Sequence, residues 1–525
     1  MRRPAFGWDI LGIEARRRLL ILLLFAAVSV ATRAPFLAVP YLDLDEAAHL
    51  VVARELLHGG TLYVDVADNR PPLLYAFYAL TQWLGGSGLP AVRVWVALLV
   101  LPLTAFAASA FFRHDRRGIL AGLLYLVYGA AYLAHDMHSV SPEVLMMLPL
   151  AAALMLAREG APASPLRFFA QGALVGVAAL VRQQAALWLP ALALAAWAAE
   201  PPGLAAAGAR ARRAFLLFAL GAGFVVPLAA CYAAFAARGA AAELVFWTWT
   251  HNLEYARNPI PTAEAVERAA TTLVPFLVAT APLSWAGWRS RALLGRSWWT
   301  LAAAAVGSLA GATLGLRFFP HYLVPLYVPL ALAAAPATAV WLDERGPKAH
   351  AALAWPLVLL AGFTAANLVL YGGSSRVYEE TRLVFRRVGE RLRADGCYGE
   401  GPLFVWGFAP EIYVEAGLRP ASRYVMPQAP LTGYVPGNRA IRNGKIAAPS
   451  LVRAEHRQRL LSDLQRRRPT FVVDTAPSGL HGWGRYPLEA FPELAAFVRE
   501  GFQPVAVLDG VWIWRRRGCE AAGRP

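Results

Sequence analysis

The chain has 525 residues, of which 58% are hydrophobic and 16% charged, well below the roughly 25% charged residues of a soluble globular protein. A mean hydropathy of +0.43 places most of the chain in lipid and excludes an ordinary soluble enzyme. The net charge of +16 does not indicate nucleic-acid binding, because the arginines occur in short groups between apolar runs.

Apolar runs recur along most of the chain. A bilayer span needs roughly 17 to 25 such residues, or fewer where a helix ends in a cavity. The first run follows Arg2, Arg3 and the basic residues 16–18, as in a cleaved signal peptide, but the many later runs favour an uncleaved first helix. About eleven transmembrane helices are predicted, centred on 19–36, 89–112, 119–134, 143–157, 169–181, 185–199, 214–237, 271–287, 298–316, 322–342 and 350–371.

Basic residues fall in alternate loops, which the positive-inside rule assigns to the cytoplasm. They are Arg113, Arg116, Arg117, Arg158, Arg167, Arg210, Arg212, Arg213, Arg289, Arg291, Arg296, Arg345 and Lys348. The opposite, periplasmic side then receives the other loops, 37–88, 135–142, 182–184, 238–270 and 317–321. The unusual polar residues of the chain all lie in these periplasmic loops.

From about residue 372 the pattern changes to alternating strand and helix signals. Strands are predicted at 402–406 and 470–474, helices at 410–416 and 453–466, and a hairpin at 505–514 that turns at Asp509-Gly510. Residues 372–525 are therefore expected to form a small α/β domain. An odd number of spans after a cytoplasmic start places it in the periplasm.

The resulting fold class is a polytopic α-helical protein of the bacterial inner membrane. Residues 1–371 form its transmembrane domain, with a large first periplasmic loop at 37–88. The cysteines Cys231, Cys397 and Cys519 have no metal-type spacing, and a Cys397–Cys519 bridge in the tail stays an open alternative.

The first periplasmic loop carries three acids within four residues, Asp43, Asp45 and Glu46. Carboxylates beside apolar helices repel one another and lose solvation, so three of them are costly without a purpose. The alternative is a helix N-cap, with Asp43 or Asp45 capping a helix that runs through Leu57. Capping explains one acid well and three poorly.

That helix should end at Gly59-Gly60, after which Asp65, Asp68 and Arg70 precede Pro71 and Pro72. The double proline fixes an extended entry into the next element. An arginine held there suits phosphate binding, because its planar fork grips two oxygens. Snorkelling of Arg70 to lipid headgroups explains the residue equally well.

These residues resemble a known family. Asp45-Glu46, Tyr63, Asp65 and the stretch 69–72 are similar to the first periplasmic loop of the family-39 and related GT-C glycosyltransferases, which include protein O-mannosyltransferases and the lipid A aminoarabinose transferase. The family pattern has Lys-Pro-Pro where this chain has Arg70-Pro-Pro. The resemblance continues at 141–143, 172–184 and 317–322, and weakly at 405–411.

The resemblance implies the GT-C fold and a sugar donor linked to polyprenyl phosphate. An acceptor hydroxyl must lose a proton as it attacks the anomeric carbon, and the departing phosphate needs cations. We assign Asp45 as the general base, with Glu46 orienting it or the acceptor. Transfer is expected to invert the anomeric carbon. The residues assigned to the donor phosphate are Arg70, Arg182, His321 and Tyr322.

Alternatives stay open for two of these residues. Arg182 could be an ordinary interfacial arginine, and a lone His321 is more often a solvated or satisfied side chain than a ligand. The family's second acidic position matches Glu143, with Asp136 as the alternative.

Metal dependence also stays open. His135 and His138 around Asp136, together with Glu143, could hold a divalent metal, because imidazole and carboxylate suit zinc and manganese. Asp43, Asp136, His138 and Glu143 are thus candidates for metal or acceptor binding. The aromatic loop from Trp247 to Tyr255 predicts an interfacial aromatic belt or, alternatively, a wall of the acceptor site.

Three functions remain in competition. An enzyme would transfer sugar to a hydroxyl of a lipid or glycan, or alternatively to a protein Ser or Thr. A lipid or sugar transporter would place ionisable groups near the bilayer midplane and show repeated halves, whereas here they gather at one face. A non-catalytic assembly factor would have no need of the acids 43–46.

Overall fold

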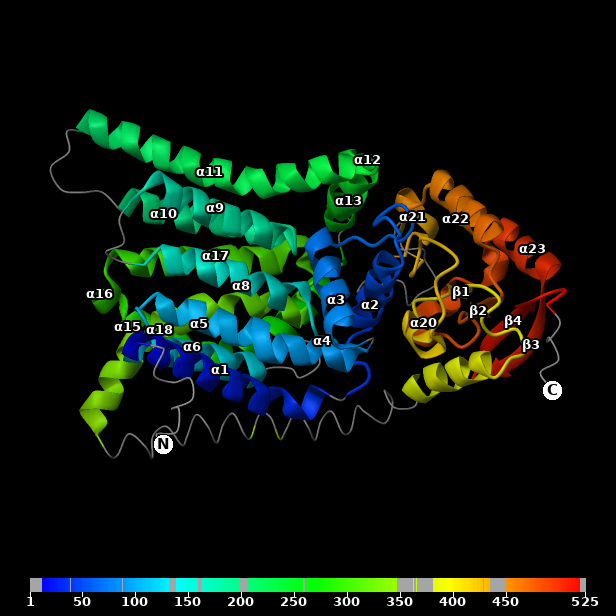
Figure 1. The fold of residues 1–525 in the computed structure, drawn as a ribbon, viewed down its shortest axis with the longest axis horizontal. Helices are drawn as coiled ribbons and strands as arrows, with labels where there is room; N and C mark the ends of the chain where they lie inside the picture. The colour runs from blue at the N-terminus through cyan, green and yellow to red at the C-terminus, as the bar shows by residue number, and fades with distance from the viewer. Residues whose placement is uncertain are drawn as a thin grey trace, which may run out of the picture.

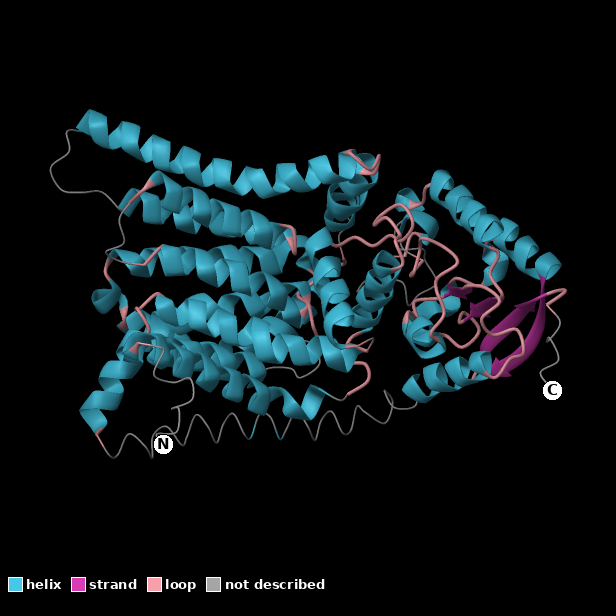
Figure 2. Ribbon diagram, in the orientation of Figure 1, coloured by secondary structure: helices cyan, strands magenta, loops and turns pink. Residues whose placement is uncertain are grey.

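The computed structural model describes residues 12–346 apart from 38, 87, 132–137, 159–162, 199–205 and 258–259. It also describes residues 381–519 apart from 428 and 435–448, together with positions 362 and 365. Long helices lie side by side in one bundle, and a smaller part with a β-sheet lies beyond one end of it (Figures 1 and 2). The short helices of the first loop lie between these two parts.

The bundle is built from helices whose order follows the apolar runs of the sequence. The helices are α1 (Ile13–Leu37), α4 (Leu89–Trp95), α5 (Leu101–Ala110), α6 (Arg116–Ala131), α8 (Pro142–Leu156), α9 (Pro165–Ala179), α10 (Leu189–Ala198), α11 (Ala206–Ala236), α14 (Thr262–Arg268), α15 (Val274–Arg289), α16 (Arg291–Leu294), α17 (Arg296–Thr313) and α18 (Tyr327–Arg345). A π-helical turn, Val96–Val100, joins α4 to α5, and another, Ala269–Leu273, joins α14 to α15.

Six helical stretches among the described residues are long and apolar enough to cross a membrane. They are Ile13–Leu37, Leu89–Ala110, Gly208–Ala236, Thr262–Arg289, Arg296–Leu316 and Pro320–Arg345, and Pro142–Leu156 and Pro165–Ala179 are shorter apolar helices. The predicted run 350–371 lies outside the described residues, apart from positions 362 and 365, so the expected total of about eleven stays a prediction.

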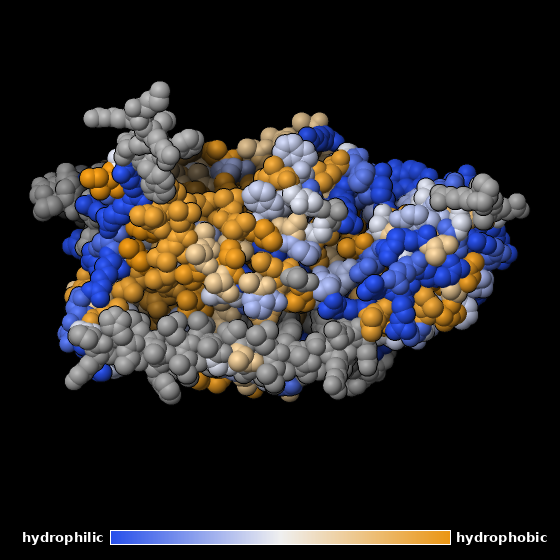
Figure 3. Space-filling model, turned by 60° about the horizontal axis from the view of Figure 1, so that its bottom comes forward, coloured by the Kyte–Doolittle hydropathy of each residue, from blue (hydrophilic) through white to orange (hydrophobic). Residues whose placement is uncertain are grey.

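The outer surface of the bundle is apolar. Phe218 is 70% exposed, Val278 68% and Val306 66%, which suits hydrocarbon and not water. Figure 3 shows this band between polar residues at one end of the bundle and the polar surface of the tail at the other. The chain is therefore a multi-pass membrane protein, as its composition predicts.

The first loop folds into two helices that cover one end of the bundle, α2 (Leu44–Leu57) and α3 (Pro72–Gly85). Asp43 caps α2, and the helix ends before Gly59, whose φ of +85° is a conformation that glycine adopts without strain. Pro71 and Pro72 start α3, as the double proline predicts. The predicted helix in the first loop is confirmed.

The tail contains a four-stranded sheet of order β1-β2-β4-β3. Its strands are β1 (Leu403–Trp406), β2 (Phe471–Asp474), β3 (Phe502–Leu508) and β4 (Val511–Arg516), with β1 parallel to β2 and the other pairs antiparallel. Its helices are α20 (Glu411–Ala416), α21 (Ala429–Thr432), α22 (Ala454–Arg467) and α23 (Pro492–Gly501). The predicted strands, both predicted helices and the hairpin turn at Asp509-Gly510 are confirmed.

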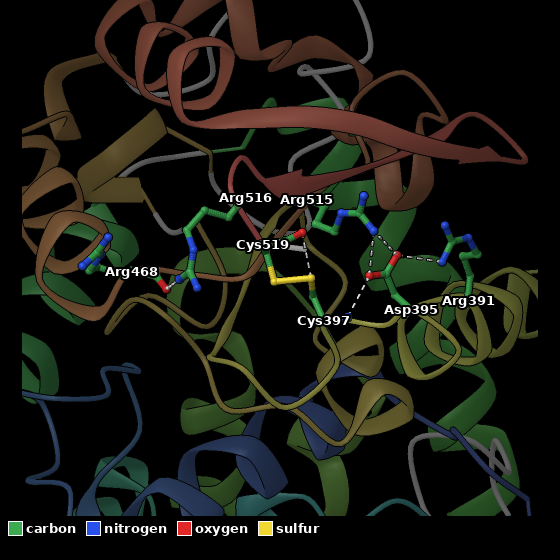
Figure 4. The surroundings of a disulfide bond; sticks show 7 residues. All are labelled: Arg391, Asp395, Cys397, Arg468, Arg515, Arg516 and Cys519. Atoms are coloured by element: carbon green, nitrogen blue, oxygen red, sulfur yellow. Dashed lines mark hydrogen bonds and ion pairs between the residues drawn. A yellow bond between two sulfur atoms is a disulfide. The ribbon is translucent and has the colours of Figure 1, made fainter. Parts of the chain in front are cut away.

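A disulfide joins Cys397 to Cys519, the pairing that the sequence left open (Figure 4). Beside it, Asp395 accepts a hydrogen bond from Arg391 at 3.1 Å and another from Arg515 at 3.2 Å. The bridge therefore ties the last strand of the sheet to the segment that precedes β1.

The tail is fastened to the first loop by polar contacts. Arg419 donates two hydrogen bonds, of 2.9 and 2.8 Å, to the buried carboxylate of Glu55 on α2. Arg467 donates to the backbone oxygen of Asp65 over 2.8 Å, and Tyr41 donates to Glu415 over 2.9 Å. The first loop is thus enclosed between the bundle and the tail.

Candidate functional site

The three acids of the first loop lie in three different environments. Asp43 caps α2 by accepting a hydrogen bond from the backbone N–H of Asp45 at 3.0 Å. Asp45, in the first turn of α2, accepts a hydrogen bond from Nη2 of Arg70 at 3.0 Å. Glu46 is buried and pairs with Arg93. Capping therefore accounts for Asp43, whereas Asp45 and Glu46 each pair with an arginine.

Arg70 is held in place by the residues around it. Its backbone oxygen accepts a hydrogen bond from the hydroxyl of Tyr63 at 2.7 Å, and its Nη1 donates to Oδ1 of Asn69 at 2.6 Å. Asn252, on α13 (His251–Arg257), donates to the backbone oxygen of Asn69 over 2.8 Å. The Nε of Arg70 is buried and has no hydrogen-bond partner among the described residues. A guanidinium with a spare donor is suited to receive an anionic oxygen.

Positive charges converge on the carboxylate of Asp45. Burial raises its pKa, but the charges of Arg70, His49, His321 and Arg182 oppose burial and hold the pKa below its ordinary value. The carboxylate is therefore ionised at neutral pH. Three of the residues assigned to the donor phosphate thus lie within electrostatic reach of the proposed base.

Arg182 and Glu143, both predicted as site residues, form a buried ion pair with Nε 3.0 Å from Oε1. Glu143 lies in the first turn of α8, which Ser141 caps, and Arg182 is the extended residue after α9. The guanidinium of Arg182 also lies 5.1 Å from the centre of the Tyr322 ring. Arg182 is therefore oriented by a carboxylate and an aromatic ring, unlike a snorkelling arginine.

His321 and Tyr322 lie in a 3₁₀-helix, Pro320–Leu326, at the end of the bundle that faces the first loop. Their rings meet edge to face at 4.8 Å, and His321 stacks on Phe319 at 5.6 Å. The preceding turn has positive φ at Leu316 (+54°) and Phe318 (+48°), which costs conformational energy in non-glycine residues. Such strain fixes the direction in which this segment presents its side chains.

Tyr255 shows that the cationic residues belong to one constellation. Burial raises the pKa of its hydroxyl, as does Tyr322, while Arg317, Arg70 and Arg182 act in the opposite direction. The guanidinium of Arg317 lies 4.4 Å from the centre of the Tyr255 ring and is 1% exposed. Arg317 and Tyr255 occur in stretches that the sequence singled out, but neither was assigned to the donor.

Glu46 does not share the surroundings of Asp45. Its side chain is 2% exposed and accepts hydrogen bonds from Arg93 and from the backbone N–H of Val140, the latter at 2.8 Å. Arg93 also donates to the backbone oxygens of Phe36 and Val39. Glu46 therefore locks α2 to α4, to the end of α1 and to the segment before α8, which is a positioning role.

A buried histidine that the sequence did not single out lies one turn beyond Asp45. His49 is 1% exposed, and its Nε2 is 3.8 Å from Oδ2 of Asp68. Asp68 accepts hydrogen bonds from the hydroxyl of Tyr75 at 2.8 Å and from the backbone N–H of Asn69 at 2.7 Å. The spacing of Asp45 and His49 on one helix was the signal that could have identified this residue.

No group of three His, Cys, Asp or Glu side chains that could hold a metal ion occurs among the described residues. His135 and Asp136 lie outside them. His138 stacks on Phe36 and shares a hydrogen bond with the backbone oxygen of Ala130 at 3.0 Å, and burial lowers its pKa to about 3. Asp43 thus caps a helix, His138 packs on Phe36 and Glu143 forms an ion pair. Binding of a metal ion at this place stays a hypothesis.

The site lies at one end of a multi-pass bundle and joins one carboxylate to several cations. The whole fold is that of a solved GT-C structure, ArnT from Cupriavidus metallidurans bound to undecaprenyl phosphate, with a TM-score of 0.58 and 15% sequence identity. The match covers 99% of this chain and 100% of that chain. ArnT from the same organism in the apo state gives a TM-score of 0.55 at 15% identity, over 94% of this chain and 97% of that one.

The archaeal oligosaccharyltransferase AglB from Archaeoglobus fulgidus gives a TM-score of 0.48 at 12% identity, over 95% of this chain and 74% of that one, and this likeness carries no argument. The sequence itself matches no protein-family model and no curated protein. At these identities the comparisons show the fold alone. The GT-C fold predicted from the first loop is confirmed.

Proposed function

We propose that this protein is a membrane glycosyltransferase that moves a sugar from a polyprenyl phosphate donor to a hydroxyl of a lipid or glycan acceptor. The observation that carries the proposal is the Asp45–Arg70 pair, with Arg182, His321 and Tyr322 around it. One ionised carboxylate among cations is the minimum that such a transfer requires. The fold shared with ArnT, which was solved bound to undecaprenyl phosphate, supports a lipid phosphate as the donor group.

In the proposed reaction, the phosphate of the donor binds Arg70, whose buried Nε has a hydrogen to donate. The phosphate competes with Asp45 for this guanidinium and offsets the positive charges that hold the pKa of Asp45 low. The freed carboxylate then accepts the proton of the acceptor hydroxyl. The hydroxyl oxygen forms a bond to the anomeric carbon as the bond from that carbon to the phosphate oxygen breaks.

The leaving polyprenyl phosphate takes the electron pair of the broken bond, and Arg70 and Arg182 stabilise its charge. A single displacement assisted by one carboxylate inverts the anomeric carbon. Glu46 acts in this scheme by fixing the start of α2 through Arg93, and not by touching the substrate.

We further propose that the site and the tail face the periplasm of a bacterial inner membrane. The basic loops gather at the other end of the bundle, as Arg116 and Asp343 illustrate with an exposed ion pair there. The Cys397–Cys519 disulfide supports the assignment, because disulfides persist in oxidising compartments such as the periplasm.

Reconstitution in liposomes tests the proposal. Wild-type protein, Asp45→Asn and the control Asp343→Asn, which removes an exposed carboxylate of α18, are incubated with candidate polyprenyl phosphate sugars and a crude lipid acceptor fraction. Mass spectrometry follows donor loss and the mass gained by the acceptor. We expect wild type and Asp343→Asn to consume one donor and Asp45→Asn to be slower by about a hundredfold or more.

The possible outcomes separate the rival functions. Equal donor consumption by wild type and Asp45→Asn would remove Asp45 as the base. Movement of an intact donor across the bilayer without cleavage would favour a transporter. Transfer to a Ser or Thr peptide, with no lipid or glycan product, would select the protein acceptor.

A further inference from the structure

His49 is a buried histidine of the first loop that no step of the proposed reaction uses. It lies on α2 one turn after Asp45, and it is 1% exposed. Its Nε2 lies 3.8 Å from Oδ2 of Asp68, and its Nδ1 is buried without a hydrogen-bond partner among the described residues. A buried polar atom without a partner is uncommon in folded proteins, so its place in the site requires a reason.

The neighbours of the imidazole hold it in one orientation. The ring of Tyr75 meets it edge to face at 5.8 Å, and the ring of Tyr78 does so at 5.4 Å. The hydroxyl of Tyr75 donates to Oδ2 of Asp68, the same oxygen that faces Nε2 of His49. A carboxylate that faces one ring nitrogen favours the hydrogen of a neutral imidazole on that nitrogen. Nδ1 then carries the lone pair and is the atom that can accept a proton.

Charged side chains of α2 and of the segment before α3 act on this imidazole. Burial lowers the pKa of His49 below its ordinary value, so the free protein holds the ring mostly neutral at pH 7. Asp68, Asp45 and Glu46 act in the opposite direction and raise this pKa, whereas Arg70 lowers it. The tyrosines of α3 add no charge, because burial raises the pKa of both hydroxyls. A further negative charge nearby would therefore favour protonation of His49.

We propose that His49 receives the proton that Asp45 removes from the acceptor hydroxyl, an inference that rests on the proposed function. The proton passes from the hydroxyl to the carboxylate of Asp45 and from there to Nδ1 of His49, which becomes a cation. The electron pair of the broken bond stays on the phosphate oxygen, so the leaving phosphate gains a second negative charge. The imidazolium balances that charge, and Asp45 is ionised again. His49 acts through Asp45 and does not touch the substrate.

The charge of the phosphate explains why the proton moves to His49 at this stage. The sugar donor is a phosphate diester with one negative charge, whereas the leaving polyprenyl phosphate is a monoester with nearly two above its second pKa of about 6. In a buried site each added negative charge favours a cation nearby. Binding of polyprenyl phosphate should therefore raise the pKa of His49, and its departure should release the proton.

Proton uptake on binding of the product tests the proposal without any sugar donor. Full-length protein in nanodiscs is titrated calorimetrically with a short-chain polyprenyl phosphate at about pH 7.5, where the monoester is mostly a dianion. The titration is repeated in a second buffer with a different enthalpy of ionisation, and the difference in heat gives the number of protons taken up. We expect wild type to take up about one proton and His49→Gln none. His58→Gln alters an exposed histidine at the end of α2 and should match wild type.

The pH dependence of the affinity is a second measurement, and it guards against misfolding. Between the pKa values of His49 in the free and in the bound protein, wild type should lose about tenfold in affinity per pH unit. Above both values the imidazole is neutral in either state, so wild type and a folded His49→Gln should bind with similar affinity. Asp68→Asn keeps the imidazole but removes a carboxylate that raises its pKa, so its affinity should begin to fall at lower pH.

The outcomes separate this inference from the proposed function. Equal proton uptake by wild type and His49→Gln would place the proton on another group, such as His321, and would overturn the role of His49 while the phosphate site stands. An Asp68→Asn profile identical to that of wild type would overturn it as well, and this profile decides alone if His49→Gln does not fold. Failure of wild type to bind polyprenyl phosphate at any pH would instead overturn the proposed function.

Discussion

The guanidinium of Arg70 donates a hydrogen bond to the carboxylate of Asp45 across 25 residues of sequence, at a distance of 3.0 Å. Asp45 starts one helix of the first loop and Arg70 precedes the other, so this contact closes the loop on itself at the site. It also makes the two residues mutually dependent, because an anionic ligand on the Nε–H of Arg70 would share the charge of this guanidinium with Asp45. The following predictions begin from this pair.

Replacement of Arg70 should impair donor binding more than the fold. Arg70→Gln is expected to lower donor affinity about tenfold to a hundredfold, since it removes a charged hydrogen-bond donor worth roughly 1.5–3 kcal/mol. Arg70→Lys, which restores the residue of the family pattern, should keep a larger part of the affinity. Equilibrium binding of a polyprenyl phosphate to protein in nanodiscs measures both. Equal losses in the two variants would show that charge at this position is not what the donor needs.

Glu46 and Arg93 should behave as a structural pair and not as catalytic groups. Glu46→Gln alone leaves Arg93 charged and buried, so it should destabilise the protein by about 3–5 kcal/mol. The double variant Glu46→Gln/Arg93→Met should recover much of the stability and of the transfer rate. Thermal unfolding and donor consumption are measured for Glu46→Gln, Arg93→Met and the double variant. A double variant that is stable but inactive would instead place Glu46 among the catalytic residues.

The sequence predicted well the features that depend on local pattern. The cap of α2, which the sequence assigned to Asp43 or Asp45, the end of α2 before Gly59-Gly60, the start of α3 and the hairpin at Asp509-Gly510 each follow from residues that favour one backbone conformation. Asp45 and Arg70, which the family resemblance and the residue types predicted as site residues, lie in contact. These features need no knowledge of which helices are neighbours.

Pairings between distant helices could not be predicted in the same way. Arg93 lies in the apolar run 89–112 and the sequence did not single it out, and its partner Glu46 is 47 residues away. Arg182 and Glu143 were both expected at the site, but their ion pair depends on how α8 packs against α9. Asp45 remains near several cations, whereas Glu46 is buried in an ion pair with Arg93. This difference depends on how the helices pack and not on composition.

The Cys397–Cys519 disulfide should stabilise the tail. It links residues 122 apart, and closing a loop of about that length in the unfolded chain corresponds to roughly 4–5 kcal/mol of stability. The double variant Cys397→Ser/Cys519→Ser should therefore lose its tail to limited proteolysis at a lower temperature than wild type. Cys231→Ser, which removes the free cysteine, is the matched control. Identical protease sensitivity of all three proteins would mean that other contacts stabilise the tail without the disulfide.

The pH dependence of transfer should reveal the charges around Asp45. Burial raises its pKa, but Arg70, His49, His321 and Arg182 lower it to below its ordinary value of 3.8, so the free enzyme should lose kcat/KM through Asp45 only in more acidic solution than that. Because the folded-state pKa is the lower one, the ion pair contributes stability above the ordinary value and loses it as the pH falls through the lowered value.

Donor binding should shift the acid limb of the pH profile to higher pH. An anionic phosphate on Arg70 offsets the positive charges and raises the pKa of Asp45, so the acid limb of kcat should lie at higher pH than that of kcat/KM. Arg70→Gln removes the cation in direct contact with Asp45 and should shift the kcat/KM limb upward as well. Single-turnover rates of both proteins from about pH 3 to about pH 8 measure the two limbs. If the acid limbs of wild type and Arg70→Gln superimpose, Asp45 does not accept the proton, because the loss of an arginine 3.0 Å away must shift its pKa.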